Sequence, residues 1–308
     1  MKTSVALCTY NGAKYIAEQL DSILQQSIPV DEIVVCDDGS TDGTMQILQK
    51  YHAEFPNIFK IHQNVQTLRV IKNFEKAIHL SSGDVIFLCD QDDVWFPNKV
   101  KTVLRYFSAN PDMEAVFHNL ELYQDGAKID LTVWESLSFD PAHFQNKDLK
   151  RILLLIGNIV TGAALAFRKQ NKNILFNDAG KFYLHDYQLA LYFSLRNKIG
   201  IIKNTLGIYR LHNEQQVGVG TIKSEHREYL MNLVMKTMDY PALFRHYKSI
   251  NLDKWGSFLV PESESTISEE INSELEIDIQ NFLRTLSKIE KLKTLMHWKI
   301  KNSRPTCI

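Results

Sequence analysis

Short apolar runs that end in polar turns alternate with helical stripes along the first part of the chain. Residues 4–8, 32–36 and 87–89 form such runs, and their composition is typical of buried strands. Apolar side chains at helical spacing follow the first two runs, within residues 16–24 and 45–51. This alternation predicts an α/β fold with a doubly wound, mostly parallel sheet flanked by helices. Ligands of such sheets bind beyond the carboxyl ends of the strands, so the three turns are expected to converge on one crevice.

The run at 87–89 ends abruptly in the carboxylates Asp90, Asp92 and Asp93. Side chains two residues apart in extended backbone point to the same side, so Asp90 and Asp92 are expected to face one spot. Two carboxylates placed there repel each other unless a cation lies between them, and Mg²⁺ or Mn²⁺ suits oxygen ligands. The alternative interpretation of this motif, taken alone, is a solvated acidic turn.

The run at 32–36 also ends in acids, Asp37 and Asp38, which precede a turn containing Gly, Ser and Thr at residues 39–44. These carboxylates either bind the hydroxyl and N–H groups of a ligand, or form the turn and cap the helix that follows. The first run ends in the turn at residues 9–12, which offers backbone groups and an aromatic edge to a ligand.

Taken in order, these motifs resemble those of family 2 glycosyltransferases of the GT-A fold. The segments that carry the resemblance are Thr9–Gly12, Asp37–Thr44, Ser82–Asp84 and Asp90–Trp95 with Pro97. Asp90–Trp95 is most similar to the bacterial rhamnosyltransferase-like branch, and the resemblance covers roughly residues 1–220. Family members often carry a Gly-containing loop before a helix that bears Asn. Residues 66–72 of this chain lack Gly, although Asn73 is present.

The resemblance implies that the donor is a nucleoside-diphosphate sugar. It places Asp38 at the base, where its carboxylate would accept the N3–H of uracil or thymine. Asp37 would contact the ribose or only brace the turn. Asp90 would hold the ribose or contact the metal through water. The residues expected to contact the donor are Thr9, Tyr10, Asn11, Asp37, Asp38, Asp90 and Arg210.

The resemblance also implies a Mn²⁺ or Mg²⁺ cofactor, with Asp92 as its direct ligand. Further along, Arg210 and His212 are two residues apart and share one face if the backbone is extended. By resemblance, His212 ligates the metal and Arg210 neutralises the departing phosphate. The alternative is a surface Arg and a structural His. The expected metal ligands are Asp92, Asp90 and His212.

Asp186 stands at the start of an apolar stripe that runs to Leu195. An Asp at a helix N-terminus is commonly a cap. Glycosyl transfer to a hydroxyl needs a general base, and enzymes that resemble this chain place an Asp here, so Asp186 is the expected base. His185 is the alternative base and an expected acceptor contact. Trp95 is a second acceptor candidate, although packing is the favoured role for so large an aromatic side chain.

These roles predict an inverting glycosyltransferase that moves a sugar to a hydroxyl of a growing cell-surface glycan. The resemblance favours dTDP-rhamnose as donor and leaves UDP-hexoses open, and the acceptor would be a glycan or a lipid-linked glycan. Two other functions stay open. A sugar-phosphate nucleotidyltransferase would be expected to carry a basic Gly-rich loop after the first strand. A non-catalytic nucleotide-sugar or glycan-binding protein would keep the fold without turnover.

Composition adds bounds to this interpretation. The chain has 308 residues, of which 44% are hydrophobic, so it can bury a core. Its net charge of −1 gives no reason to expect a nucleic acid as partner. The four cysteines are scattered, which favours reduced thiols in a cytoplasmic protein. The apolar stretch 152–167 is interrupted by polar and Gly residues and is shorter than the roughly 20 residues of a membrane span. It is predicted to be a helix end, a turn and a core strand, and no signal peptide is recognised before the first strand.

A catalytic domain is expected at residues 1–220, with a nucleotide-sugar half at about 1–110 and an acceptor half at about 111–220. Residues 221–308 are predicted to form a helical C-terminal region. Within it, residues 282–308 have the pattern of a basic amphipathic helix. Such a helix either lies on an anionic membrane surface, here the inner face of the cell membrane, or packs on its own domain or on a second subunit of a homo-oligomer.

Overall fold

The computed structural model describes residues 1–137, 139–141, 149, 152–153, 158–172, 176, 184–212 and 215. All of them belong to one unit of the chain, Met1–Arg227. The predicted helical region 221–308, its amphipathic segment 282–308 and the predicted boundary near residue 220 lie outside the described residues.

The first part of the chain alternates strands with helices, as the sequence predicted. The elements are β1 (Thr3–Thr9), α1 (Ile16–Leu24), β2 (Glu32–Asp37), α2 (Thr44–Glu54), β3 (Phe59–Gln63), α3 (Arg69–Leu80), β4 (Val85–Cys89), β5 (Val94–Trp95) and α4 (Lys99–Ala109). The apolar runs form β1, β2 and β4, and every residue of these three strands is buried. Strands covered on both faces read as continuous apolar runs, which explains the sequence pattern.

In the second part of the chain, the described strands and helices do not alternate regularly. Its elements are β6 (Ala115–Gln124), β7 (Ala127–Thr132), α5 (Val133–Ser136), the 3-10 turn η1 (Gly162–Ala164), β8 (Leu165–Arg168), the 3-10 turn η2 (Lys169–Asn171), α7 (His185–Leu195) and β9 (Ile199–Leu211). Asp125 and Gly126 link β6 to β7, both with positive φ (51° and 81°). A two-residue turn of this kind matches the twist of an antiparallel hairpin.

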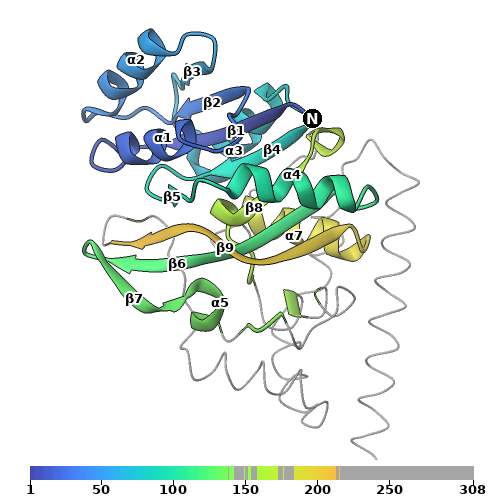
Figure 1. Cartoon of the computed structure of the whole chain (residues 1–308). Helices are drawn as coiled ribbons and strands as arrows, with labels where there is room; N and C mark the ends of the chain where they lie inside the picture. Colours follow the sequence, from blue (N-terminus) through green and yellow to red (C-terminus); the bar gives the residue numbers. More distant parts are fainter. Residues whose placement is uncertain are drawn as a thin grey trace, which may run out of the picture. The chain divides into compact units, whose positions relative to one another are not determined.

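One sheet joins the described strands in the order β3-β2-β1-β4-β8-β6-β9-β5, with β7 paired to β6 (Figure 1). The strands β3, β2, β1 and β4 are parallel, which confirms the predicted doubly wound α/β architecture. Beyond β4 the sheet is mixed, because β8 runs antiparallel to both β4 and β6 while β9 runs parallel to β6.

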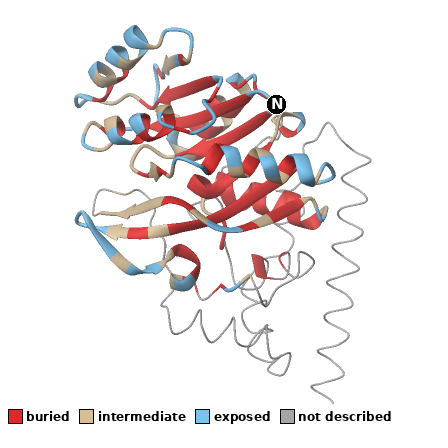
Figure 2. Ribbon diagram, in the orientation of Figure 1, coloured by how far each residue is buried: buried red, intermediate tan, exposed pale blue. Residues whose placement is uncertain are grey.

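The core lies on both faces of the parallel strands. On one face, Val5, Ile33 and Phe87 belong to a cluster that includes Leu20 of α1 and Val103 of α4. On the other face, α3 contacts β1 and β2. The burial colouring shows this pattern, with buried strands in the middle and exposed residues on the outer surfaces of the helices (Figure 2). This packing fixes the ends of the strands and thus the positions of their turns.

The carboxyl ends of β1, β2 and β4 lie side by side. Thr9 is paired with Asp37 across β1 and β2, and Leu7 is paired with Cys89 across β1 and β4. The turns that follow these strands therefore emerge at one edge of the sheet, as the sequence predicted. Most of the candidate groups discussed below belong to these turns or to α7 and the end of β9.

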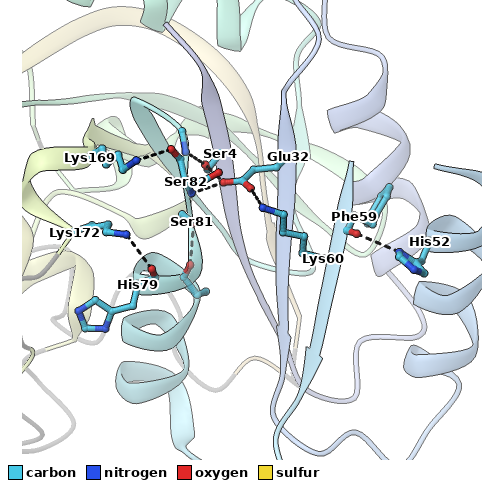
Figure 3. A network of polar contacts seen from close by, with 12 residues as sticks. Ser4, Glu32, His52, Phe59, Lys60, His79, Ser81, Ser82, Lys169 and Lys172 are labelled. Carbon is cyan, nitrogen blue, oxygen red and sulfur yellow. Dashed lines mark hydrogen bonds and ion pairs between the residues drawn. The ribbon is translucent and has the colours of Figure 1, made fainter. Parts of the chain in front are cut away.

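At the opposite edge, Glu32 joins the beginnings of the parallel strands (Figure 3). Its buried carboxylate accepts hydrogen bonds from the Ser4 hydroxyl and the Ser82 N–H, and it forms an ion pair with Lys60. Lys169 lies beside this network and donates to the Ser82 carbonyl at 2.9 Å. Glu32 thus ties β1, β2, β3 and the loop before β4 together.

The apolar stretch that ends near residue 167 contains the predicted core strand, while residues 154–157 of this stretch lie outside the described residues. Ile152 and Leu153 are helical, residues 158–161 are irregular, and Leu165 begins the core strand β8. Within the described ranges, no helix has both the length and the apolar character needed to span a bilayer. The thiols of Cys8, Cys36 and Cys89 are buried and free, as expected, and Cys307 lies outside the described residues.

Candidate active site

Gln91 joins the turn after β1 to the acidic loop after β4. Its Oε1 accepts hydrogen bonds from Thr9 Oγ1 at 2.6 Å and from the Tyr10 N–H at 2.8 Å, and its Nε2 donates to the Tyr10 carbonyl at 3.1 Å. The Tyr10 side chain stays 41% exposed beside this junction. Sequence reasoning did not single out Gln91, although its position inside the acidic motif was a usable signal.

Asn11 links the turns after β1 and β2. It has a φ of 50°, a region that Asn tolerates better than most residues. Its N–H donates to Ser40 Oγ at 2.8 Å, and its Oδ1 accepts from the Thr41 N–H at 2.9 Å. These contacts shape the rim of the site, and the expected contact of Asn11 with a donor stays a prediction.

Asp37 braces the turn that follows β2. Its buried carboxylate accepts the N–H groups of Gly39 at 3.2 Å and Ser40 at 2.9 Å, and it also bonds the Ser40 hydroxyl. Gly39 has a φ of 85°, which a side chain would strain. The sequence left two roles open for Asp37, bracing the turn or contacting a ribose. These hydrogen bonds are those of a residue that braces the turn, while a ribose contact stays a prediction.

Asp38 anchors the loop that leads into α3. Its Oδ1 accepts from Asn64 Nδ2 and from the Leu68 N–H, both at 2.7 Å, and its Oδ2 accepts from the Arg69 N–H at 2.8 Å. Arg69 has a φ of 62°, the conformation that glycine adopts most readily. The loop therefore reaches Asp38 without the expected Gly. A carboxylate has about four acceptor positions, so Asp38 retains the capacity to accept an N–H from a ligand.

The three carboxylates after β4 repel one another. Burial, followed by the charges of Asp92 and Asp186, raises the pKa of Asp90 well above its usual range. Burial, followed by the charges of Asp92 and Asp90, does the same to the pKa of Asp93. Asp93 Oδ1 accepts the Arg210 N–H at 3.4 Å, while its buried Oδ2 has no hydrogen-bond partner among the described residues. Such a concentration of negative charge favours the binding of a cation.

Asp186 lies in the first turn of α7 with both carboxylate oxygens fixed. Oδ1 accepts the Tyr187 N–H at 2.7 Å, and Oδ2 accepts the Gly162 N–H at 3.1 Å. Burial raises the pKa of Asp186 to about 6, although these bonds and one from the Asn158 side chain oppose the shift. A carboxylate with such a pKa is ionised at neutral pH and still basic enough to take a proton.

Gly162 brings the acids of the two sequence halves together. A Cβ added to it would lie 3.6 Å from Asp90 Oδ2, 3.7 Å from Asp186 Cβ and 3.0 Å from His185 Nε2. The acidic loop and the start of α7 therefore meet at one point, although 96 residues separate Asp90 from Asp186 (186 − 90). The charges of both acids also act on Tyr209, whose pKa is raised chiefly by burial.

His185 is buried beside this junction. Its ring stacks on Phe74 with centroids 3.8 Å apart and an interplanar angle of 15°. Burial lowers the pKa of His185 to about 3, so the imidazole is neutral at physiological pH. Neither ring nitrogen has a hydrogen-bond partner among the described residues. Its roles as acceptor contact or alternative base stay predictions.

Arg210 and His212 at the end of β9 both contact Tyr15. The Arg210 guanidinium lies 5.5 Å from the Tyr15 ring centroid, and the His212 ring lies 4.6 Å from it. Arg210 Nη2 pairs with Glu18 Oε1 at 2.6 Å, and His212 Nε2 lies 2.8 Å from Asp92 Oδ2. The expected proximity of His212 to Asp92 is thus present. Sequence reasoning missed Tyr15 and Glu18, which lie on the turn before α1 and on α1.

Trp95 and Lys99 lie beneath the acidic loop. Trp95 is buried and packs on Phe87 with ring centroids 5.6 Å apart, which agrees with the packing role favoured by the sequence. The Lys99 ammonium lies 3.9 Å from the centroid of the Trp95 ring and donates to the Ala163 carbonyl at 2.7 Å. Burial lowers the pKa of Lys99 to about 8 against the opposing charges of Cys89, Asp93 and Asp90. Sequence reasoning did not single out Lys99.

The side chains at this edge suit a hard divalent cation. Asp92 Oδ2 and His212 Nε2 lie 2.8 Å apart, within hydrogen-bond distance of each other, and the charge of Asp92 acts on Asp90. In the described part of the chain, no group of at least 3 His, Cys, Asp or Glu side chains is arranged to hold a metal by itself. Mg²⁺ and Mn²⁺ sites of nucleotide enzymes need few protein ligands, because substrate phosphates and water complete the coordination. Asp92 and His212 fit a partial site of this kind.

Comparison with protein families decides the assignment. The sequence signature described as glycosyl transferase family 2 matches residues 4–175, which include the turns after β1, β2 and β4. The chain belongs to glycosyltransferase family 2. The match covers more than half of the 308 residues and contains Asp38, Asp90 and Asp92, whereas Asp186, Arg210 and His212 lie beyond it.

Curated relatives agree with this membership. An uncharacterized protein of Mycobacterium tuberculosis, Rv1520, is 28% identical over 214 residues, which is 68% of this chain and 58% of that protein. The dTDP-rhamnosyl transferase RfbG of Shigella flexneri is 29% identical over 225 residues, which is 69% of this chain and 73% of the relative. The chain matches less than two thirds of the length of four of the curated relatives, Rv1520 among them.

Solved structures confirm the GT-A fold. TarS residues 1–349 of Staphylococcus aureus, in complex with UDP-GlcNAc, has a TM-score of 0.54 at 18% identity, covering 95% of this chain and 92% of that one. The mannosyltransferase PcManGT of Pyrobaculum calidifontis, in complex with GDP-Man and Mn²⁺, has a TM-score of 0.50 at 16% identity. The match covers 93% of this chain and 86% of that one. The predicted family and fold are thus both confirmed.

Proposed function

We propose that this glycosyltransferase transfers a sugar from a nucleoside-diphosphate donor to an acceptor hydroxyl, with inversion at the anomeric carbon and with the help of Mn²⁺ or Mg²⁺. The observation that carries the proposal is the meeting of Asp90 and Asp186 around Gly162. It brings a candidate base next to the acidic loop that carries Asp92, the partner of His212. Donor and acceptor would thus meet at one edge of the sheet.

In this proposal Asp186 is the general base. Its carboxylate takes the proton of the acceptor hydroxyl as that oxygen forms a bond to the anomeric carbon. The bond from the anomeric carbon to the phosphate oxygen breaks, and the nucleoside diphosphate leaves with the electron pair. A single displacement of this kind inverts the anomeric centre. The bonds from Gly162 and Tyr187 orient the carboxylate, and its pKa of about 6 keeps it ionised at neutral pH.

On the leaving-group side, Arg210 would bind the diphosphate through its guanidinium fork. Asp92 and His212 would hold the divalent ion, which neutralises charge on the diphosphate when it is bound. Tyr15 supports both Arg210 and His212 through its ring. Asp38 would receive the N3–H of the base on its remaining acceptor position. Thr9 and Tyr10, joined to the acidic loop by Gln91, would border the nucleoside.

We further propose dTDP-rhamnose as the donor, with UDP-hexoses as the alternative. The RfbG relative, named a dTDP-rhamnosyl transferase, supports this choice at 29% identity. TarS, solved with UDP-GlcNAc, shares only the fold and motivates the alternative. The acceptor would be a hydroxyl of a cell-surface or lipid-linked glycan, reached from the cytoplasm at the inner face of the membrane.

Turnover of nucleotide sugars tests the proposal. The full chain is incubated with dTDP-rhamnose, UDP-glucose, UDP-galactose or UDP-GlcNAc, each with Mn²⁺ and with EDTA, and the released nucleoside diphosphate is measured with water as the acceptor. We expect release that depends on Mn²⁺ for at least one donor. Pyrophosphate release from a nucleoside triphosphate and a sugar 1-phosphate would instead identify a nucleotidyltransferase. Thermal stabilisation by a donor without any turnover would identify a binding protein.

A further inference from the structure

Lys99 is a buried cation beside the proposed site. It opens α4 and is only 2% exposed. Lysine is rarely buried to this degree unless its ammonium is paired. Here the ammonium donates to the Ala163 carbonyl at 2.7 Å and lies over the Trp95 ring at 3.9 Å. Its fixed position therefore depends on the η1 turn, Gly162–Ala164.

The same turn also forms a hydrogen bond with Asp186. The Gly162 N–H donates to Asp186 Oδ2 at 3.1 Å, while the carbonyl of the next residue, Ala163, receives Lys99. One short turn thus connects α4, which follows the acidic loop, with α7, which carries the candidate base. The turn runs directly into β8 and contacts β4 and β6, and these two side-chain bonds hold it from the sides of α4 and α7.

The position of this turn sets the spacing of the candidate catalytic groups. A Cβ on Gly162 would lie 3.6 Å from Asp90 Oδ2 and 3.7 Å from Asp186 Cβ. The backbone of Gly162 is therefore the surface between the two carboxylates. A shift of the turn toward either side would change the distance between the base and the donor, and transfer reactions are sensitive to such shifts.

We propose that Lys99 is a positioning residue that holds the η1 turn through the Ala163 carbonyl and thereby places the Asp186 carboxylate for sugar transfer. This inference rests on the proposed function. A role limited to balancing the charges of Asp90 and Asp93 would act on the donor side. Loss of Lys99 would then change nucleotide binding at least as much as turnover, so the two roles make different predictions.

The test compares Lys99→Met with Lys169→Met. Methionine keeps the length of the buried stem and removes the ammonium. Lys169 is a matched control, because its ammonium also donates to a backbone carbonyl, that of Ser82, at the opposite edge of the sheet (Figure 3). We expect Lys99→Met to lower donor turnover at saturating donor by about 10- to 100-fold. The dissociation constants of UDP and dTDP with Mn²⁺ should stay within about threefold, a change below about 1 kcal/mol. Lys169→Met should match the wild type in both readouts.

Gly162→Ala addresses the same turn without removing a charge, and it decides the question if Lys99→Met does not fold. Its Cβ would meet His185 Nε2 at 3.0 Å, which forces the turn or the imidazole to move. We expect the same pattern, lower turnover with nucleotide binding preserved. Unchanged turnover in a folded Lys99→Met, or in Gly162→Ala, would overturn the positioning role, as would an equal loss of nucleotide binding. A wild-type protein that releases no nucleoside diphosphate from any donor would instead refute the proposed function, and the role of Lys99 with it.

Discussion

Asp186 combines burial with two backbone hydrogen bonds, and the balance between them sets its chemistry. Burial disfavours the charged carboxylate and raises the pKa to about 6, while the N–H groups of Tyr187 and Gly162 favour the charged form. The carboxylate is therefore protonated below about pH 6 and ionised above it. A base acts only in its ionised form, so the pKa of this one residue should appear in the activity.

We predict that donor turnover rises as the pH increases from 5 to 7 and then levels off, with an apparent pKa near the value of about 6 for Asp186. Asp186→Asn keeps an oxygen for the Gly162 N–H but cannot take a proton. It should lower turnover by about 10²- to 10⁴-fold and leave nucleotide binding nearly unchanged. Initial rates at saturating donor across this pH range measure both effects. A flat profile in the wild type would exclude Asp186 as the base.

Glu18 offers a second prediction at the same scale. Glu18 Oε1 forms an ion pair with Arg210 Nη2 at 2.6 Å, and the Glu18 side chain is 64% exposed. A donor diphosphate would have to compete with it for Arg210. Glu18→Gln should therefore strengthen UDP or dTDP binding by about two- to fivefold, since exposed ion pairs contribute less than about 1 kcal/mol. Isothermal titration with Mn²⁺ measures this change. Glu54→Gln on α2 alters the net charge equally and should have no effect, and weaker binding in Glu18→Gln would contradict this role of Glu18.

Sequence reasoning selected residues whose chemistry is local and missed residues whose contacts come from distant parts of the chain. Asp90 and Asp92 stand in one short motif after an apolar run, so their position could be predicted. Lys99 matters because it meets Ala163, which is 64 residues away. Glu18 matters because it meets Arg210, which comes from the last described strand. Spacing along the chain carries no information about such contacts.

At the scale of elements, the parallel strands account for the site. Both faces of β1, β2 and β4 are covered, so these strands are continuous apolar runs that could be predicted from the sequence. Their parallel pairing brings the turns that follow them to one edge of the sheet. The mixed pairing of β8, β6 and β9 could not be predicted in the same way. Continuous apolar segments such as Leu165–Arg168 do not reveal the direction of the strand or its neighbours.

The amino ends of the same strands depend on Glu32 (Figure 3). Burial opposes its ionisation, but hydrogen bonds from Lys60, Ser4 and Ser82 outweigh burial and lower its pKa from 4.5 to about 2. The folded state thus holds the ionised form more strongly than the unfolded chain does. This contribution to stability is present above pH 4.5 and is lost as the pH falls toward 2.

Glu32→Gln should lower the free energy of unfolding by about 1–3 kcal/mol at neutral pH, because it leaves buried donors without a charged acceptor. Urea denaturation measures this loss, which should shrink as the pH is lowered below 4.5. Glu121→Gln is the matched control, since Glu121 pairs with the half-exposed Lys128. It should cost less than about 1 kcal/mol. Equal costs for the two variants would contradict the assigned role of Glu32.

At the scale of the whole molecule, the site draws on both sequence halves of one family 2 glycosyltransferase. In the proposed function, the turns after β1, β2 and β4 would form the nucleotide side, and the η1 turn, α7 and the end of β9 would bring Asp186, Arg210 and His212 to it. The family signature covers residues 4–175, so the assignment of the later groups rests on the geometry described above. Residues 221–308 keep their predicted helical character and their predicted membrane or subunit contact as hypotheses.

The central claim is that acids from separate strand ends and His212 form one metal-dependent nucleotide site. Titration of UDP and dTDP into the wild type, Asp92→Asn and the exposed control Asp112→Asn, each with Mn²⁺ and with EDTA, tests it most directly. We predict Mn²⁺-dependent binding in the wild type and in Asp112→Asn. In Asp92→Asn, binding should be weaker by about tenfold or more, a loss of at least about 1.4 kcal/mol. Equal affinity in Asp92→Asn, or equal affinity of the wild type with and without Mn²⁺, would contradict the account.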